Sequence, residues 1–315
     1  MTMIRTSTPV ETGKLPSQLG YKDCFTLLGS CFSDEIAGIM DSLFFNMMSN
    51  PTGTLYNPAS IAAVIRRMDS REHFTMDDVE EIGNGIAAYS SFWHHSRFAD
   101  TCPEEFLSKA NDFMDKAAGH FGKSSVVIVT FGTSWAYRHE KKDIIVANCL
   151  KHDAREFKRF FLSPEETARI WSEEIIPAHK DKTWIFTVSP IRHLKDGLHG
   201  NALSKAALLA ACEEICSRHS SCHYFPAFEI MNDELRDYRY YADDLVHPST
   251  LAVRIIWEKF RSYAFTPETV ALMDEAAKIR SGLEHRPLFP GLQDNAAFHE
   301  KYLKMKEDFL KKAMP

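Results

Sequence analysis

The sequence predicts an α/β fold in which a mostly parallel sheet is covered by helices on both faces. Short apolar runs of strand length recur along the chain, and most are followed by a longer segment with the apolar spacing of a helix. Glycine, proline and serine separate these segments, as is usual at turns. Strands that alternate with helices are joined by crossover connections, so they lie parallel and bury both faces of the sheet.

The first unit is a strand, a tight turn and a helix. Residues 25–28 form a short apolar strand, and the glycine of Gly29-Ser30-Cys31 permits a sharp turn after it. We expect Ser33 to cap a helix that runs to Leu43, because acidic residues follow Ser33 and suit a helix N-terminus.

The remaining elements follow the same pattern. The further strands are expected over 125–130, 183–188 and 223–226, with a hairpin over 135–149. The further helices are expected over 59–68, 76–88, 103–120, 164–176, 202–218, 249–263, 267–282 and 296–312. We therefore expect one α/β domain over 1–265 and a C-terminal helical extension over 266–315 that packs on it.

Composition sets limits on function. The chain has 315 residues, so it can bury a large core without disulfide bonds or a structural metal. Its formal net charge of −6 argues against nucleic-acid binding. No apolar stretch approaches the ~18 residues of a membrane span. Seven cysteines without a CxxC pair, and no signal-peptide run, predict a cytoplasmic protein, although prior removal of a signal peptide would leave the same sequence.

Three polar segments follow predicted strands. They are Gly29-Ser30-Cys31, Gly132-Thr133-Ser134 and the run from Ser189 to His193. Because the carboxyl ends of parallel strands share one edge of a sheet, these segments are expected on one rim, where α/β folds bind ligands. Arg192 can bind an anionic group and His193 can act as a ligand or a donor, or both can cap carbonyl groups of a loop.

A possible acid–base pair precedes the helix expected at 249. In Asp244-Leu245-Val246-His247, the carboxylate can reach Nδ1 of the histidine and leave Nε2 free to act as a base. A nucleophile in the Gly29-Ser30-Cys31 turn would lie near backbone N–H groups at a helix start. Each motif alone is also compatible with an ordinary helix-entry turn.

The adjacent pair His94-His95 suggests a metal site at first sight. Neighbouring histidines point in different directions, and no carboxylate or cysteine stands at ligand spacing. We therefore interpret Phe92–Phe98 as an aromatic loop that packs over the rim, and we predict no metal and no cofactor.

Combined in this order, the motifs resemble the GSCFA domain family. The run Leu27-Leu-Gly-Ser-Cys-Phe-Ser33 is similar to the motif that names the family, with Ser33 in place of its alanine. The other stretches that resemble the family are Asn50-Pro-Thr-Gly-Thr-Leu-Tyr-Asn-Pro58, Trp93-His-His-Ser-Arg-Phe98, Phe131-Gly-Thr-Ser-Trp-Ala-Tyr137, Asn148-Cys149, Thr187-Val-Ser-Pro-Ile-Arg-His193 and Tyr241-Ala-Asp-Asp-Leu-Val-His-Pro248. The residues beyond 250 carry no such motif.

The family is placed among the SGNH (GDSL-like) hydrolases. The resemblance therefore implies a flavodoxin-like three-layer α/β/α fold with added C-terminal helices, and ester hydrolysis or acyl transfer without a cofactor. In the SGNH pattern the first conserved motif, or block, is a Gly-Asp-Ser turn that follows the first strand. Alignment on its glycine puts Ser30 at the aspartate position and Cys31 at the position of the nucleophilic serine. In the last block, Asp244 and His247 match directly.

Two departures from the SGNH pattern matter. Cysteine replaces the nucleophilic serine, so either Cys31 or Ser30 is the nucleophile. The second-block glycine corresponds to Gly53, whose N–H, with that of Cys31, is expected to hold the oxyanion. The third block, which begins at Gly132, lacks the oxyanion asparagine and offers Thr133 or Ser134 instead. Loss of a good oxyanion donor costs about 3 kcal/mol of transition-state stabilisation.

Three functions remain open from the sequence. The first is a hydrolase or acyltransferase that acts on a small-molecule or carbohydrate acyl ester, with Arg192 and His193 as substrate-binding residues. The second is a non-catalytic module that binds a small molecule or carbohydrate on a degenerate SGNH fold. The third is an assembly role in which the helices over 267–312 hold a partner. The acyl group and the oligomeric state are open as well.

Overall fold

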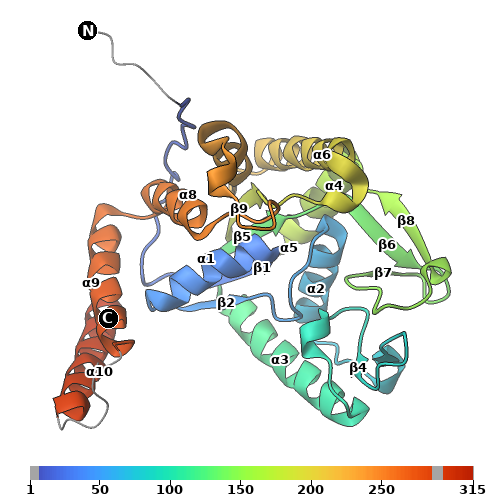
Figure 1. Ribbon diagram of the computed structural model, residues 1–315, viewed down its shortest axis with the longest axis horizontal. Coiled ribbons are helices and arrows are strands. Elements are labelled where there is room, and N and C mark those ends of the chain that lie inside the picture. Colours follow the sequence, from blue (N-terminus) through green and yellow to red (C-terminus); the bar gives the residue numbers. More distant parts are fainter. Residues whose placement is uncertain (1–6, 286–293, 315) are drawn as a thin grey trace.

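A five-stranded parallel sheet forms the centre of the molecule (Figure 1). The computed structural model describes residues 7–285 and 294–314. The strands are β1 (Phe25–Gly29), β2 (Met47–Ser49), β5 (Val126–Phe131), β9 (Thr183–Val188) and β10 (Cys222–Tyr224). Their spatial order is β10-β9-β5-β1-β2. Counted along the chain, this is the order 2-1-3-4-5 of flavodoxin-like folds, so the predicted fold class is confirmed.

Helices cover both faces of the sheet. One face carries α1 (Cys31–Ser42), α7 (Ala227–Glu229) and α8 (Thr250–Ala264). The other carries α2 (Pro58–Ser70), α3 (Pro103–Lys123), α4 (Pro164–Arg169), α5 (Ile176–Ala178) and α6 (Gly197–Arg218). None of the described helices combines the length and apolar character that a membrane crossing requires.

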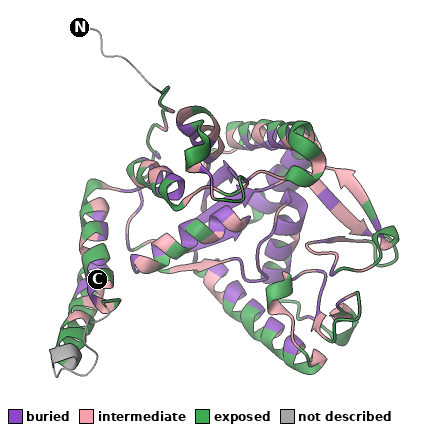
Figure 2. Ribbon diagram, in the orientation of Figure 1, coloured by how far each residue is buried: buried purple, intermediate pink, exposed green. Residues whose placement is uncertain are grey.

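The strands explain why both faces need helices. All six residues of β5 are buried, and their side chains alternate between the two apolar cores. Val126 and Ile128 join the core beneath α1 and α8, whereas Val127 and Val129 join the core beneath α2, α3 and α6. Figure 2 shows the strands as a buried layer between helices with exposed outer faces.

The hairpin expected over 135–149 is present and larger than predicted. It consists of β6 (Trp135–His139) and β7 (Ile144–Val146), and the unpredicted strand β8 (Phe157–Phe161) pairs with the other edge of β6. The three strands form an antiparallel sheet beside the carboxyl edge of the central sheet, because β6 begins four residues after β5 ends.

The prediction of a helix over 76–88 is wrong. Only a 3₁₀ turn forms at Met76–Asp78, followed by a two-residue pairing of β3 (Glu80–Glu81) with β4 (Tyr89–Ser90). The physical reason lies in the segment between the strands, where Asn84 and Gly85 have φ angles of 66° and 69°. This left-handed conformation cannot continue a helix.

The start of α1 also differs from the prediction. The helix begins at Cys31 with Ser30 as its N-cap residue, and Ser33 lies buried in the first turn. The reason is the turn at Gly29, which redirects the chain directly after the strand. The segment over 164–176 is helical as expected, although its turn Ile170–Ile175 is π-helical.

The C-terminal helices α9 (Pro267–Leu283) and α10 (Asp294–Ala313) lie side by side at one end of the molecule (Figure 1). Their buried residues Met273, Ile279 and Phe309 belong to the same core as α1 and α8. The ring of Phe309 meets that of Tyr21 edge-on at 5.3 Å. The extension therefore packs on the α/β core, as its helical apolar spacing predicts.

Candidate active site

The turn after β1 requires glycine. Gly29 has a φ of +133°, and a Cβ at this position would lie 2.1 Å from the carbonyl oxygen of Thr130. The Gly29 N–H donates to Oδ1 of Asn50 at 2.8 Å, and its carbonyl accepts from the N–H of Leu55 at 2.9 Å. These bonds fix the turn, which makes Cys31 the first residue of α1.

Cys31 lies at the open end of this turn. Its side chain is half-buried and lines a cleft of about 480 Å³. Its Sγ is 3.4 Å from the hydroxyl oxygen of Tyr56. Neither the N–H of Cys31 nor that of Phe32 has an acceptor among the described residues, as is typical of the first turn of a helix. Such N–H groups stabilise negative charge.

Ser30, the other predicted nucleophile, is placed differently. It is only 1% exposed and does not line the cleft. Its hydroxyl is buried without a hydrogen-bond partner in the described structure. Of the two adjacent candidates, the structure therefore presents Cys31 to the cleft and turns Ser30 into the interior.

Asp244 and His247 form a hydrogen-bonded pair. Oδ2 of Asp244 lies 2.6 Å from Nδ1 of His247, while Oδ1 accepts the N–H groups of Val246 and His247 at 2.9 Å and 3.0 Å. The chain turns around the carboxylate of Asp244 because Leu245 adopts the left-handed conformation, with a φ of +58°. The two N–H groups and the imidazole lower the pKa of Asp244 to about 2. The ionised carboxylate fixes the proton of His247 on Nδ1, so Nε2 is left as a base.

The cleft brings the predicted segments together. It opens beyond the carboxyl ends of β1, β5 and β9, beside the point where the strand order reverses. Its walls come from the start of α1, the loop after β9, the turn that holds His247, and the added antiparallel sheet. The lining residues are Cys31, Tyr56, Asn57, Thr133, Trp135, Tyr137, Val146, Ala147, Arg159, Ile191, Arg192, His193, Lys195, Asp196, Val246 and His247.

The backbone N–H groups of the third block bind the backbone of Tyr56 and are not free to bind an oxyanion. The N–H groups of Gly132 and Thr133 both donate to the carbonyl of Tyr56 at 2.8 Å. The Ser134 hydroxyl donates to the carbonyl of Ser204 on α6 at 3.1 Å, so it points away from the cleft. Only Thr133 of this block lines the cleft. The expected use of Ser134 as an oxyanion donor is therefore wrong.

Gly53 is also a structural residue. Its N–H donates to the carbonyl of Asn50 at 2.8 Å, and Gly53 does not line the cleft. Its φ is +90°, and an added Cβ would meet Cβ of His95 at 2.4 Å. The expected oxyanion contact from the Gly53 N–H is therefore wrong in this structure, because that donor is already used.

His193 is a neutral imidazole in the cleft wall. Burial, followed by the charge of Lys205, lowers the pKa of His193 to about 4. Its Nε2 is buried without a partner among the described residues, and its ring meets that of Tyr56 edge-on at 5.8 Å. Arg192, its neighbour, also lines the cleft. Both residues therefore line the cleft, and their expected role in substrate binding stays a prediction.

Two residues of the site are missing from the sequence-based prediction. Tyr56 contacts Cys31, and burial raises the pKa of its hydroxyl to about 12, so the hydroxyl keeps its proton. Lys205 is fully buried and donates to the carbonyls of Gly132 and Ser189 at 2.7 Å each, which ties the ends of β5 and β9 together. A signal for Lys205 exists, because it stands three residues before Leu208 on the apolar face of α6.

His94 is part of an aromatic cluster, but no residue of the Phe92–Phe98 loop lines the cleft, so its packing over the rim stays a prediction. His94 is 1% exposed and lies against the rings of Phe74, Phe98 and Phe106. Its Nδ1 is 2.6 Å from the hydroxyl of Ser91. Burial lowers the pKa of His94 to about 3.

We expect this histidine to make the fold less stable in acid. Below pH 6.5 the unfolded chain binds a proton that folded His94 does not take up until about pH 3, so the free energy of unfolding falls across that window. From pH 7 to pH 5 the loss is up to about 2 kcal/mol. Urea unfolding at both pH values should show that the free energy of unfolding falls less in His94→Gln than in the wild type. His73→Gln, at an exposed histidine, should behave like the wild type; an equal loss in His94→Gln would contradict the assignment.

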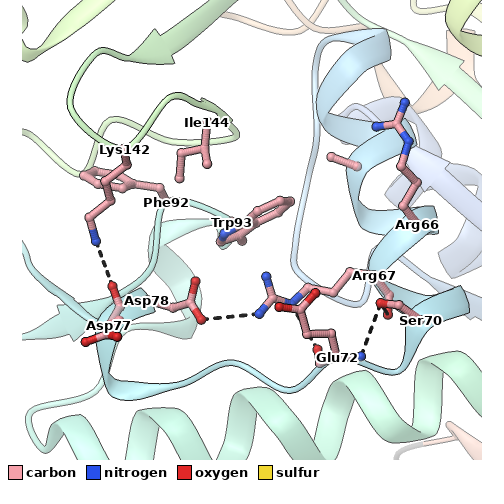
Figure 3. A pocket seen from close by; sticks show the side chains of 11 residues that line it. Arg66, Arg67, Ser70, Glu72, Asp77, Asp78, Phe92, Trp93, Lys142 and Ile144 are labelled. Atoms are coloured by element: carbon pink, nitrogen blue, oxygen red, sulfur yellow. Dashed lines mark hydrogen bonds and ion pairs between the residues drawn. The ribbon is translucent and has the colours of Figure 1, made fainter.

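A larger hollow of about 590 Å³ lies at the other end of α2 (Figure 3). Its three cations already have carboxylate partners: Arg67 pairs with Asp78 at 3.3 Å, Arg66 with Glu174 at 2.5 Å, and Lys142 with Glu80. Arg67 is also held against the rings of Phe74 and Trp93. This hollow holds none of the residues that carry the acid–base geometry, so the cleft with Cys31 is the candidate active site.

Comparison with known proteins agrees with the motifs. Residues 24–260 match the GSCFA family. The chain belongs to the GSCFA family. The match runs from the start of β1 into α8 and so includes Cys31, Asp244 and His247, whereas α9 and α10 lie outside it. No curated protein matches the chain.

Proposed function

We propose that this GSCFA protein is a hydrolase or acyltransferase of the SGNH type that acts on acyl esters or thioesters. The observation that carries the proposal is that Cys31 and His247 line the same cleft, with His247 oriented by an ionised Asp244. Nucleophilic acyl transfer needs a thiol, a base and a carboxylate that orients the base.

The reaction would run in two steps. His247 Nε2 takes the thiol proton of Cys31, Sγ attacks the acyl carbon, and the protonated His247 returns the proton to the departing alkoxide or thiolate. The product is a thioester on Cys31. Water or an acceptor alcohol then loses a proton to His247 and attacks that thioester, and the thiol of Cys31 is restored. Tyr56, which keeps its proton, can donate to Sγ when the thiolate forms.

Oxyanion stabilisation would combine the N–H of Cys31, which the SGNH pattern also uses, with groups outside that pattern. The N–H groups of Cys31 and Phe32 have no acceptor among the described residues. The neutral ring of His193 supplies a further N–H in the cleft wall, where a buried nitrogen lacks a partner. A neutral imidazole donates a hydrogen bond without changing the charge of the site.

We therefore expect His193→Phe to lower kcat on the order of 10²-fold to 10³-fold, as loss of one oxyanion donor does. The ring shape is kept, so KM should change much less than kcat. Steady-state kinetics on an acetyl thioester would measure both. His199→Phe, at an exposed position of α6, is the matched control. A kcat close to that of the wild type in His193→Phe would rule out an oxyanion role.

The proposed function itself is tested with short acyl esters and thioesters. The wild type should hydrolyse them, or transfer the acyl group to an added alcohol, and His247→Ala should lose this activity while remaining folded. Folded wild-type protein that is inactive on both classes in the absence and presence of an acceptor would refute the proposal.

A second candidate is a non-catalytic binding module on the same fold. It is favoured by the third block, in which Gly132 and Thr133 use their N–H groups on Tyr56, and by Gly53, whose N–H is bonded to Asn50. Such a module would bind its ligand in the same cleft. It would show no reactive residue at position 31 beyond the reactivity of an ordinary thiol.

A further inference from the structure

The cleft is positively charged in a protein whose overall charge is negative. Three cations, those of Arg159, Arg192 and Lys195, line it, with Asp196 as the one lining carboxylate. The chain as a whole has a formal net charge of −6. A cationic cleft on an acidic protein favours an anionic ligand, because the charge is concentrated where the ligand binds.

Two of the three cations lack a carboxylate partner among the described residues. Arg159 pairs with Asp196 at 2.5 Å, which accounts for the one lining carboxylate. No carboxylate of the described residues lies within ion-pair distance of Arg192 or Lys195. Lys195 instead donates to the hydroxyl of Tyr137 at 3.0 Å. Both of these cations come from the loop after β9, so they lie on one segment of the cleft wall.

Arg192 is held in place by two aromatic rings and not by a carboxylate. Its guanidinium carbon lies 4.1 Å from the ring centre of Tyr241 and 5.5 Å from that of Tyr238. Stacking on aromatic rings fixes the plane of a guanidinium and leaves its edge donors for a ligand oxygen. The backbone N–H of Arg192 donates to the carbonyl of Val246 at 3.2 Å, which places the loop directly beside His247.

This placement distinguishes the two halves of a substrate. In the proposed reaction His247 returns the proton to the leaving oxygen or sulfur, so the leaving group lies on the His247 side of the cleft. The backbone N–H of Arg192 is bonded to Val246, the residue that precedes His247, so Arg192 lies on the same side of the cleft. We propose that the physiological substrate is an acyl ester or thioester whose leaving alcohol or thiol carries a phosphate or similar anion, bound by Arg192 and Lys195. This inference rests on the proposed hydrolase or acyltransferase function.

Three small esters test it. Phenyl acetate is neutral, 4-acetoxybenzenesulfonate carries its anion on the leaving group, and monophenyl succinate carries its anion on the acyl group. Each kcat/KM is divided by the rate constant for attack of hydroxide on the same ester, because the neighbouring carboxylate speeds the hydrolysis of monophenyl succinate in neutral buffer. We expect the wild type to prefer the sulfonate to phenyl acetate on the order of 10-fold to 100-fold, the range expected for a charged hydrogen bond. Added salt should reduce this preference.

In Arg192→Gln the preference for the sulfonate should fall by a similar factor, and in Lys195→Gln it should fall less. Arg239→Gln, at an exposed arginine outside the cleft, is the matched control and should keep the wild-type preference. A wild type without preference for the sulfonate, or a preference that survives in Arg192→Gln, would overturn the inference. An equal or greater preference for the succinate would overturn the assignment to the leaving group.

Failure of the proposed function can be separated from failure of this inference. If the wild type hydrolyses none of the three esters, calorimetric binding of 4-hydroxybenzenesulfonate tests the anion site alone. Binding to the wild type that is lost in Arg192→Gln would support the site and leave only the catalytic proposal refuted. Absence of binding to the wild type would overturn both.

Discussion

Cys31→Ala is expected to lower kcat/KM for thioester hydrolysis by at least about 10⁴-fold, because removal of a nucleophile leaves only binding and oxyanion stabilisation. The substitution removes one sulfur from a half-buried side chain at a helix start. The fold should therefore be retained. Steady-state kinetics, with circular dichroism to check folding, would measure the effect.

The adjacent serine offers the matched control. Ser30 is buried outside the cleft and its hydroxyl has no partner among the described residues, so Ser30→Ala should leave kcat/KM within about 3-fold of the wild type. Its stability should change little, since no hydrogen bond is lost. Activity that disappears in Ser30→Ala and persists in Cys31→Ala would assign the nucleophile to the serine and contradict the geometry described above.

Gly29→Ala is expected to destabilise the fold by about 4 kcal/mol, the largest stability effect we predict. The added Cβ would lie 2.1 Å from the Thr130 carbonyl oxygen, and the residue would have to hold a φ of +133°. To relieve the clash, β1 must move away from β5 just where the nucleophile turn begins. Urea denaturation would give the difference in the free energy of unfolding.

Gly38→Ala is the control within the same unit. Gly38 lies at an exposed position inside α1, and a Cβ there would have no atom within 4 Å. Alanine should stabilise this helix by roughly 0.5–1 kcal/mol. Two alanine substitutions nine residues apart should therefore act in opposite directions. Similar small changes in both variants would show that the turn at Gly29 is not constrained as described.

Apolar pattern predicts four of the five strands of the central sheet and most helices, but it misses the short edge strand β2. The runs at β1, β5 and β9 are buried on both faces, so their composition is distinctive. Pattern fails where a strand is stabilised by tertiary pairing. Residues 157–161 alternate little between apolar and polar character, and they form β8 because β6 offers a free edge.

The candidate site is predictable only in part. A contact between neighbours in sequence, such as Asp244 with His247, can be read from spacing. Whether a backbone N–H is free depends on distant partners, and no spacing shows that the donors of Gly132 and Thr133 are used on Tyr56. The contact of Tyr56 with Cys31 likewise depends on where the loop after β2 passes.

The most direct test of the central claim is intact-mass spectrometry after brief exposure to an activated acetyl ester, followed by peptide mapping. The geometry predicts a single acetyl group on Cys31 that disappears over minutes in the wild type. In His247→Ala, the acetyl group should form slowly and, once formed, should persist. Two results would contradict the account and favour a binding module. One is folded wild-type protein without an acetyl group on Cys31. The other is a stable acetyl group that forms on other cysteines as readily as on Cys31.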